Sequence, residues 1–204
     1  SCSEISCDCN VNALPPITLV EIMGKETGWL TASSALARIN GDGAPDLIYL
    51  CERPFSIDDF IDDVRDKMAE KNAVVVAVSE GLRDASGEYI STALQNQVSG
   101  ATGQKVLAGV ARFLEEILKR EIGCKVRSVK LNLMQRCASH IASQNDIVEA
   151  QRMGRAAAAF AIAGGSGEMV ALRRLSSTPY QTEICFVSLQ DVVNRVKHVP
   201  DTWI

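Results

Sequence analysis

The hydrophobic positions of this chain follow two alternating spacings, one typical of strands and the other typical of helices. Short apolar, β-branched runs predict strands over residues 17–22, 46–50, 73–78 and 125–133. Apolar positions three or four residues apart predict helices over residues 29–39, 56–71 and 105–122. The run at 73–78 is apolar on both faces, as in a strand covered from both sides. The pattern predicts an α/β fold whose mainly parallel sheet is flanked by helices on both faces.

The last third of the chain continues with shorter elements. The spacing predicts a helix over 146–163, stopped by a Gly-Gly-Ser-Gly run, then short strands and a short helix over 168–172, 183–188 and 189–196. The 204 residues allow one large domain or two small ones, since domains run roughly 100–200 residues. We therefore expect a partial second domain after the parallel sheet.

Composition and charge limit which partners and which compartment we expect for this protein. The chain has 21 Lys and Arg against 25 Asp and Glu, a formal charge of −4, which argues against a nucleic-acid partner. No apolar run approaches the length of a membrane span, and the N-terminal residues lack a secretory pattern. An odd count of 7 cysteines and only 2 histidines, with a short Cys7-Asp8-Cys9 spacing, favours a reduced cytoplasmic protein without a metal site.

Three predicted strands are followed by residues that suit a phosphorylated polyol. Ligands of open α/β sheets lie beyond the carboxyl ends of the strands, and these ends read Met23-Gly24-Lys25, Ser79-Glu80-Gly81 and Met134-Gln135-Arg136. Lys25 and Arg136 could hold an anion, whereas Glu80 could accept hydrogen bonds from sugar hydroxyls. Gly24 would let the backbone approach a ligand. The alternative is that strand ends carry charge simply because they meet water.

Four segments in the same order resemble the phosphofructokinase family. They are Val20–Trp29, Leu47–Phe55 (LIYLCERPF), Val74–Gly81 and Lys125–Gly154, and the resemblance covers about residues 17–204. The residues Gly28-Trp29 and the LIYL segment resemble those of the pyrophosphate-using branch. The resemblance implies a phosphofructokinase-like substrate domain over residues 17–136 and a return segment over 137–204 that belongs partly to a phosphoryl-donor domain. Residues 1–16 are then a lead-in or an upstream remnant.

The resemblance also implies roles for single residues. In the family the turn that aligns with Met23, Gly24 and Lys25 contacts fructose 6-phosphate, and the glutamate that aligns with Glu80 contacts its hydroxyls. Arg136 inherits the 6-phosphate contact, and Leu133, Met134 and Gln135 lead into it. Arg127 inherits a second 6-phosphate contact that often comes from a neighbouring subunit, which implies a homo-oligomer. Lys25 stands where the family usually has Arg, so the bidentate geometry of a guanidinium is lost.

The activity implied by the resemblance needs more than these residues. The family moves a phosphoryl group from pyrophosphate or ATP to the 1-hydroxyl of fructose 6-phosphate with Mg²⁺, a step of glycolysis. Its T-x-D-N-D and donor-loop motifs are not found in this sequence, and Asn40-Gly41-Asp42-Gly43 fits a plain turn. We therefore assign no catalytic residue, expect Mg²⁺ to bind outside this chain, and expect the chain alone to be inactive.

Two other classes of protein stay open at this stage. One is a non-catalytic binding or regulatory module that kept the sugar-phosphate pocket. The other is an unrelated nucleotide-binding α/β protein, for which the Gly24–Gly28 turn lacks the spacing of a phosphate loop.

Overall fold

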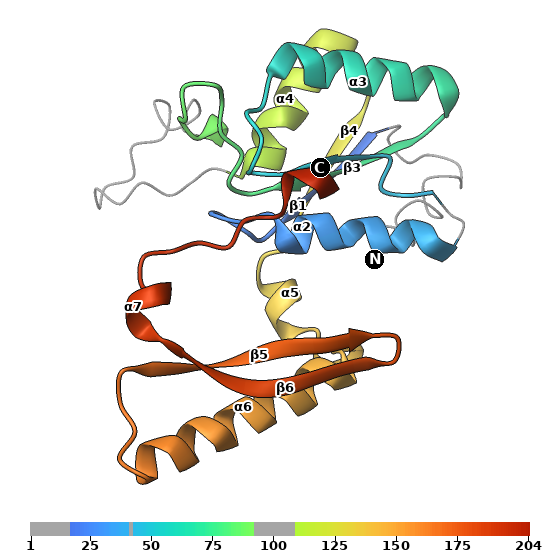
Figure 1. The fold of residues 1–204 in the computed structure, drawn as a ribbon. Helices are drawn as coiled ribbons and strands as arrows, with labels where there is room; N and C mark the ends of the chain where they lie inside the picture. Colours follow the sequence, from blue (N-terminus) through green and yellow to red (C-terminus); the bar gives the residue numbers. More distant parts are fainter. Residues whose placement is uncertain (1–16, 41–42, 92–108) are drawn as a thin grey trace. The chain divides into compact units, whose positions relative to one another are not determined.

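The computed structural model describes residues 17–40, 43–91 and 109–204, which form two compact units (Figure 1). One unit comprises the described residues up to Gln135 together with Lys197–Ile204, and the other unit is Arg136–Val196. Their assignment to a substrate domain and a donor domain stays a prediction, and residues 1–16 lie outside the described part. Within that part, no helix combines the length and apolar character that a bilayer span requires.

The first unit is built on a four-stranded parallel sheet. Its strands are β1 (Ile17–Ile22), β2 (Leu47–Tyr49), β3 (Val74–Ser79) and β4 (Val126–Lys130), in the order β2-β3-β1-β4. The predicted parallel α/β sheet is therefore confirmed, with β1 as predicted and the other three strands within a few residues of their predicted bounds. Both central strands, β1 and β3, are buried at every position, as the apolar run of β3 predicted, and in β1 this burial includes the polar residues Thr18 and Glu21.

Helices lie on both faces of this sheet (Figure 1). Helices α3 (Ile57–Glu70) and α4 (Val110–Ile122) cover one face, where Phe60, Leu114 and Leu118 pack against alternate residues of β1 and β3. The short helix α2 (Trp29–Ser33) and the 3₁₀ helix η1 (Ser34–Asn40) lie on the other face. The second face has a smaller buried cluster, made of Val20, Ile22, Ala44, Val75 and Ala77.

Helix ends are fixed by the residues that the sequence indicated and by one that it did not. The Ser56 side chain accepts a hydrogen bond from Asp59 N at 3.3 Å, and Gly123 ends α4 with φ 74°. The unexpected residue is Glu21 on β1, whose side chain is only 2% exposed. Its carboxylate accepts from Ala111 N at 2.9 Å in the first turn of α4 and pairs with Lys130 Nζ at 3.0 Å.

Two predicted elements of the first unit differ from the structure. The helix expected over 29–39 is one α-helical turn followed by 3₁₀ helix. The strand expected over 125–133 ends at Lys130, because Asn132 adopts a left-handed conformation with φ 40° that a strand cannot continue through. Leu133 therefore begins a short helix, α5 (Leu133–Cys137), instead of ending a strand.

The second unit contains a long helix and an antiparallel hairpin. After η3 (Ser139–Ile141), α6 (Gln144–Ile162) is followed by β5 (Glu168–Ser177), β6 (Tyr180–Ser188) and α7 (Leu189–Val192). The two strands are longer than predicted. Their pairing runs from Glu168 opposite Ser188 to Ser177 opposite Tyr180. Phe160 of α6 and Phe186 of β6 lie with ring centroids 4.7 Å apart. None of residues 136–196, all of which are described, is buried.

Leu114→Ala tests the larger buried cluster. Leu114 is fully buried, so we expect the free energy of unfolding to fall by about 2–5 kcal/mol through lost burial and a residual cavity. The matched control is Leu36→Ala on η1, where the side chain is 64% exposed and little burial is lost. Urea unfolding of the two variants measures both losses, and equal losses would contradict the described core.

Candidate functional site

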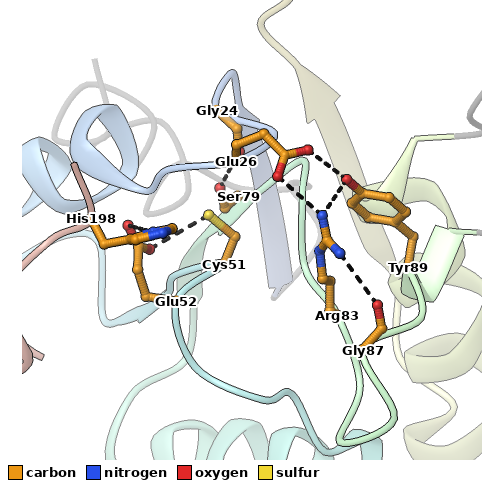
Figure 2. Close-up of polar contacts among 9 residues, drawn as sticks. All are labelled: Gly24, Glu26, Cys51, Glu52, Ser79, Arg83, Gly87, Tyr89 and His198. Carbon is orange, nitrogen blue, oxygen red and sulfur yellow. Dashed lines mark hydrogen bonds and ion pairs between the residues drawn. The ribbon is translucent and has the colours of Figure 1, made fainter. Parts of the chain in front are cut away.

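The carboxyl ends of β1 and β3 meet at one level of the sheet. The strands pair in register, with Ile22 opposite Ser79, and Glu80 N continues the ladder by donating to Ile22 O at 3.1 Å. Beyond this point Glu80 Oε1 accepts a hydrogen bond from Gly24 N at 3.1 Å. Ser79 Oγ donates to Gly24 O at 2.8 Å, as Figure 2 shows. The Met23–Lys25 and Ser79–Gly81 strand ends singled out in the sequence therefore lie in direct contact.

Two glycines allow this close approach. A Cβ atom built on Gly81 would overlap the backbone carbonyl of Lys25, so the two turns touch through their main chains. Gly24 has φ 146°, a conformation that side chains rarely adopt, and its Cβ would overlap Thr27 O. Gly81 therefore makes room for the neighbouring turn, and Gly24 makes room for the Thr27 carbonyl within its own turn.

The segment after β4, Met134–Arg136, also contacts this edge of the sheet, through Gln135. Gln135 Oε1 accepts a hydrogen bond from Met23 N at 2.9 Å. Leu133 and Met134 are 66% and 59% exposed. Arg136 is the first residue of the second unit, and its place in the site stays a prediction.

Lys25 lies at the same edge, beside a group of three polar side chains that the sequence analysis did not single out. Tyr89 OH donates to Glu26 Oε1 at 2.8 Å, and Arg83 Nη2 donates to Tyr89 OH at 2.6 Å and to Glu26 Oε2 at 3.1 Å (Figure 2). The Lys25 ammonium lies 5.2 Å from the centroid of the Tyr89 ring. Arg83 and Tyr89 follow β3, in a stretch where the spacing of hydrophobic positions predicts neither a strand nor a helix.

Arg127 lies away from this edge within one chain. It pairs with Thr18 on β1, four residues before the end of that strand, which is roughly 13 Å at about 3.3 Å per residue. Its surroundings are a pocket of about 500 Å³ lined by residues of α4 and β4, namely Arg112, Glu115, Lys119, Lys125, Val126, Arg127 and Ser128. A role for Arg127 at the strand-end site would therefore have to be exercised on another copy, and it stays a prediction.

Glu52, which follows β2, holds the other end of the Met23–Gly28 turn. Its carboxylate side chain is 5% exposed and accepts hydrogen bonds from Gly28 N at 2.8 Å and Val199 N at 3.1 Å. A Cβ on Gly28 would lie 2.5 Å from Glu52 Oε2, which explains the glycine. His198 Nδ1 lies 4.0 Å from the same carboxylate (Figure 2). Glu52 thus joins the turn to the last residues of the chain.

The titration behaviour of this corner favours a structural role. Burial raises the pKa of Glu52, but the hydrogen bonds from Gly28 N, Val199 N and the Cys51 thiol outweigh it and hold the pKa below 4.5. Burial raises the pKa of the Cys51 thiol to about 11, so it is a poor nucleophile near neutral pH.

Metal ligands do not converge in the described part of the chain. Within residues 17–40, 43–91 and 109–204, no three His, Cys, Asp or Glu side chains are grouped as a metal site would require. We therefore derive no chemical step through Mg²⁺ from these residues.

A parallel sheet whose strand ends converge on one edge defines an α/β protein with a candidate ligand site at that edge. The family model described as phosphofructokinase matches residues 10–161. The chain belongs to the phosphofructokinase family.

Individual relatives are similar over nearly the whole chain. The pyrophosphate–fructose 6-phosphate 1-phosphotransferase of Xanthomonas campestris pv. campestris is 36% identical over 191 residues, which cover 92% of this chain and 44% of the relative. The enzyme of that name from Rhodospirillum rubrum is 36% identical, covering 94% of this chain and 48% of the relative. The solved pyrophosphate-dependent phosphofructokinase of Marinobacter aquaeolei has a TM-score of 0.81 at 28% identity, covering 100% of this chain and 47% of its own. The chain thus spans about half the length of these relatives.

Gly81→Ala tests the contact between the two turns. The added methyl would overlap the Lys25 carbonyl, so we expect a loss of about 1–3 kcal/mol in the free energy of unfolding. The control is Gly154→Ala in α6, where a built Cβ meets no atom within 4 Å and helix propensity favours alanine. Thermal unfolding followed by circular dichroism compares the two, and a tolerated Gly81→Ala would contradict the described turn.

Glu52→Gln tests the buried carboxylate through its pH dependence. Because the folded-state pKa lies below 4.5, the ionised group stabilises the fold above that pH, and this contribution is lost as pH falls through the folded pKa. At pH 7 we expect the variant to be less stable by about 1–3 kcal/mol, as for hydrogen bonds to a charged group.

The comparison with wild type is made by urea unfolding at several pH values. The gap between the two proteins should be full at pH 7 and shrink below pH 4.5. Glu70→Gln is the control, because that side chain is 60% exposed and its ion pair with Lys67 is solvated. A gap that does not depend on pH would refute the carboxylate's role.

Proposed function

We propose that this chain binds fructose 6-phosphate as the acceptor-sugar part of a pyrophosphate-dependent 6-phosphofructokinase. The observation that carries the proposal is the contact between Glu80 and Gly24, which joins the two sequence segments that resemble the family's sugar site. Glu80 Oε1 is engaged by Gly24 N, whereas Oε2 has no hydrogen-bond partner among the described residues. That second oxygen is available to accept hydrogen bonds from sugar hydroxyls.

The phosphate end of the sugar needs cations. In this proposal Lys25 acts as a point charge beside Glu80, and Arg136 grips the 6-phosphate through two parallel hydrogen bonds. Met23 and Gly24 contribute backbone, and Gln135 supports them through its hydrogen bond to Met23 N. Leu133 and Met134 precede Arg136 in the chain and are included in the proposed site. Arg127 would serve the site of a neighbouring copy, so the active assembly would be a homo-oligomer.

The choice of donor is supported by the relatives rather than by the site. The two relatives described above and the solved neighbour all carry pyrophosphate in their names. Phosphoryl transfer to the 1-hydroxyl needs a base and a metal clamp on the donor, and no three His, Cys, Asp or Glu side chains of the described residues are grouped as such a clamp would require. We propose that these parts, with Mg²⁺, come from outside the chain, and that the assembled enzyme works in cytoplasmic glycolysis.

Calorimetric titration with fructose 6-phosphate tests the proposal. We expect millimolar or tighter binding by the wild-type chain and its loss in Arg136→Ala, because a charge-assisted bidentate contact to phosphate is removed. The control is Arg155→Ala, an exposed cation on α6 for which no bonding partner is found among the described residues. Binding in the control should equal wild type.

The outcomes separate the proposal from its alternatives. Equal heats in wild type and Arg136→Ala would remove Arg136 from the site, and no heat in any variant would remove the sugar-phosphate site itself. Binding that persists without turnover after addition of a family donor half, pyrophosphate and Mg²⁺ would instead favour a non-catalytic module.

A further inference from the structure

We propose that Tyr89 is a positioning residue that fixes the Lys25 ammonium at the sugar-phosphate site. The inference rests on the proposed function, because it concerns the one cation that the Met23–Gly28 turn contributes. Lysine has a flexible four-carbon stem and a point charge, so it lacks the fixed fork with which arginine grips a phosphate. A lysine at this position therefore needs an external surface to limit where its charge lies.

The Tyr89 ring is such a surface, because it is held at its hydroxyl end. Its OH donates to Glu26 and accepts from Arg83, and these two residues also pair with each other at 3.1 Å. Burial raises the pKa of Tyr89, and its hydrogen bond to Glu26 raises it further, so the hydroxyl remains a neutral donor at physiological pH. The closed triangle shown in Figure 2 fixes the position of the phenol oxygen, and with it the place of the ring beside Lys25.

The backbone that carries Tyr89 is equally constrained. Arg83 and Tyr89 face each other in an antiparallel bridge, and Ile90 N donates to Leu82 O at 3.1 Å just beyond them. Leu82 and Ile90 are buried in the larger core cluster. Asp84 Oδ1 accepts from Ser86 N at 2.8 Å and Glu88 N at 3.1 Å, which closes the turn between the two sides. The ring is thus attached to the core through a tight loop.

The charges around the ring leave Lys25 for an external anion. The Arg83 guanidinium lies 4.1 Å from the ring centroid, and Lys25 Nζ lies 5.2 Å from it, within the range of cation–π attraction. Glu26 is next to Lys25 in sequence but is engaged by Arg83 and Tyr89. In the described part of the chain no carboxylate pairs with Lys25. Tyr89 therefore holds the ammonium without neutralising it.

A double-mutant cycle tests the inference. The variants are Tyr89→Leu, Lys25→Met and the two combined, each titrated with fructose 6-phosphate. We expect Tyr89→Leu to weaken binding about two- to five-fold, the range of an exposed cation–π contact. In the Lys25→Met background the same change should have no further effect, since Tyr89 acts through Lys25. Tyr89→Phe keeps the aromatic face, so it should restore part of the affinity.

A second measurement needs no substrate. Acetylation of Lys25 by an amine-reactive ester, followed by mass spectrometry against Lys125 in the same sample, should be faster in Tyr89→Leu than in wild type. Equal weakening by Tyr89→Leu in both backgrounds would show a merely structural role and overturn the inference. An unchanged Lys25 acetylation rate would also overturn it. If wild type binds no fructose 6-phosphate, the proposed function fails, whereas the acetylation rates still decide whether Tyr89 positions Lys25.

Discussion

The in-register pairing of β1 with β3 is the constraint on which the candidate site depends. Because Ile22 lies opposite Ser79, both strands end at the same level of the sheet. The backbones of the residues that follow them are therefore in contact. Gly81 satisfies this by having no side chain against the Lys25 carbonyl. A shift of one residue would turn each buried side chain to the other face of the sheet and separate Glu80 from Gly24.

The parts of the site that could be predicted from sequence are those set by the sheet. Continuous apolar runs define the buried strands, and parallel strands place their carboxyl ends at one edge. That reasoning was enough to expect the residues after the first and third strands of the chain at one edge, where Gly24 N donates to Glu80 Oε1, whereas their role in binding stays a prediction. The role of Glu52 could not be predicted, because its partners, Gly28 and Val199, lie 24 and 147 residues away. No local pattern encodes such contacts.

Other differences come from single backbone conformations and from pairing that spacing does not reveal. Asn132 ends β4 early through a left-handed conformation, which hydrophobic alternation over 125–133 does not show. The β5–β6 hairpin extends through Arg173 and Arg174. Because these residues are polar, the apolar pattern ends before them and predicts a shorter strand. Tyr89 lies in a loop without periodicity, and its approach to Lys25 depends on contacts such as the Arg83–Tyr89 bridge that no local spacing encodes.

The carboxylates around the Met23–Gly28 turn bear on the anion-binding role that the proposed function gives to Lys25. Three glutamates surround the turn, and an unconstrained glutamate would pair with Lys25 and cancel its charge. Instead Glu80 accepts from Gly24 N, Glu26 is held by Arg83 and Tyr89, and Glu52 accepts from Gly28 N. Each carboxylate thus accepts hydrogen bonds from backbone N–H groups or from Arg83 and Tyr89, and in the described part of the chain none of the three pairs with Lys25. The acidic residues thus hold the turn in place without pairing with Lys25, which is the condition that the proposed contact with a phosphate requires.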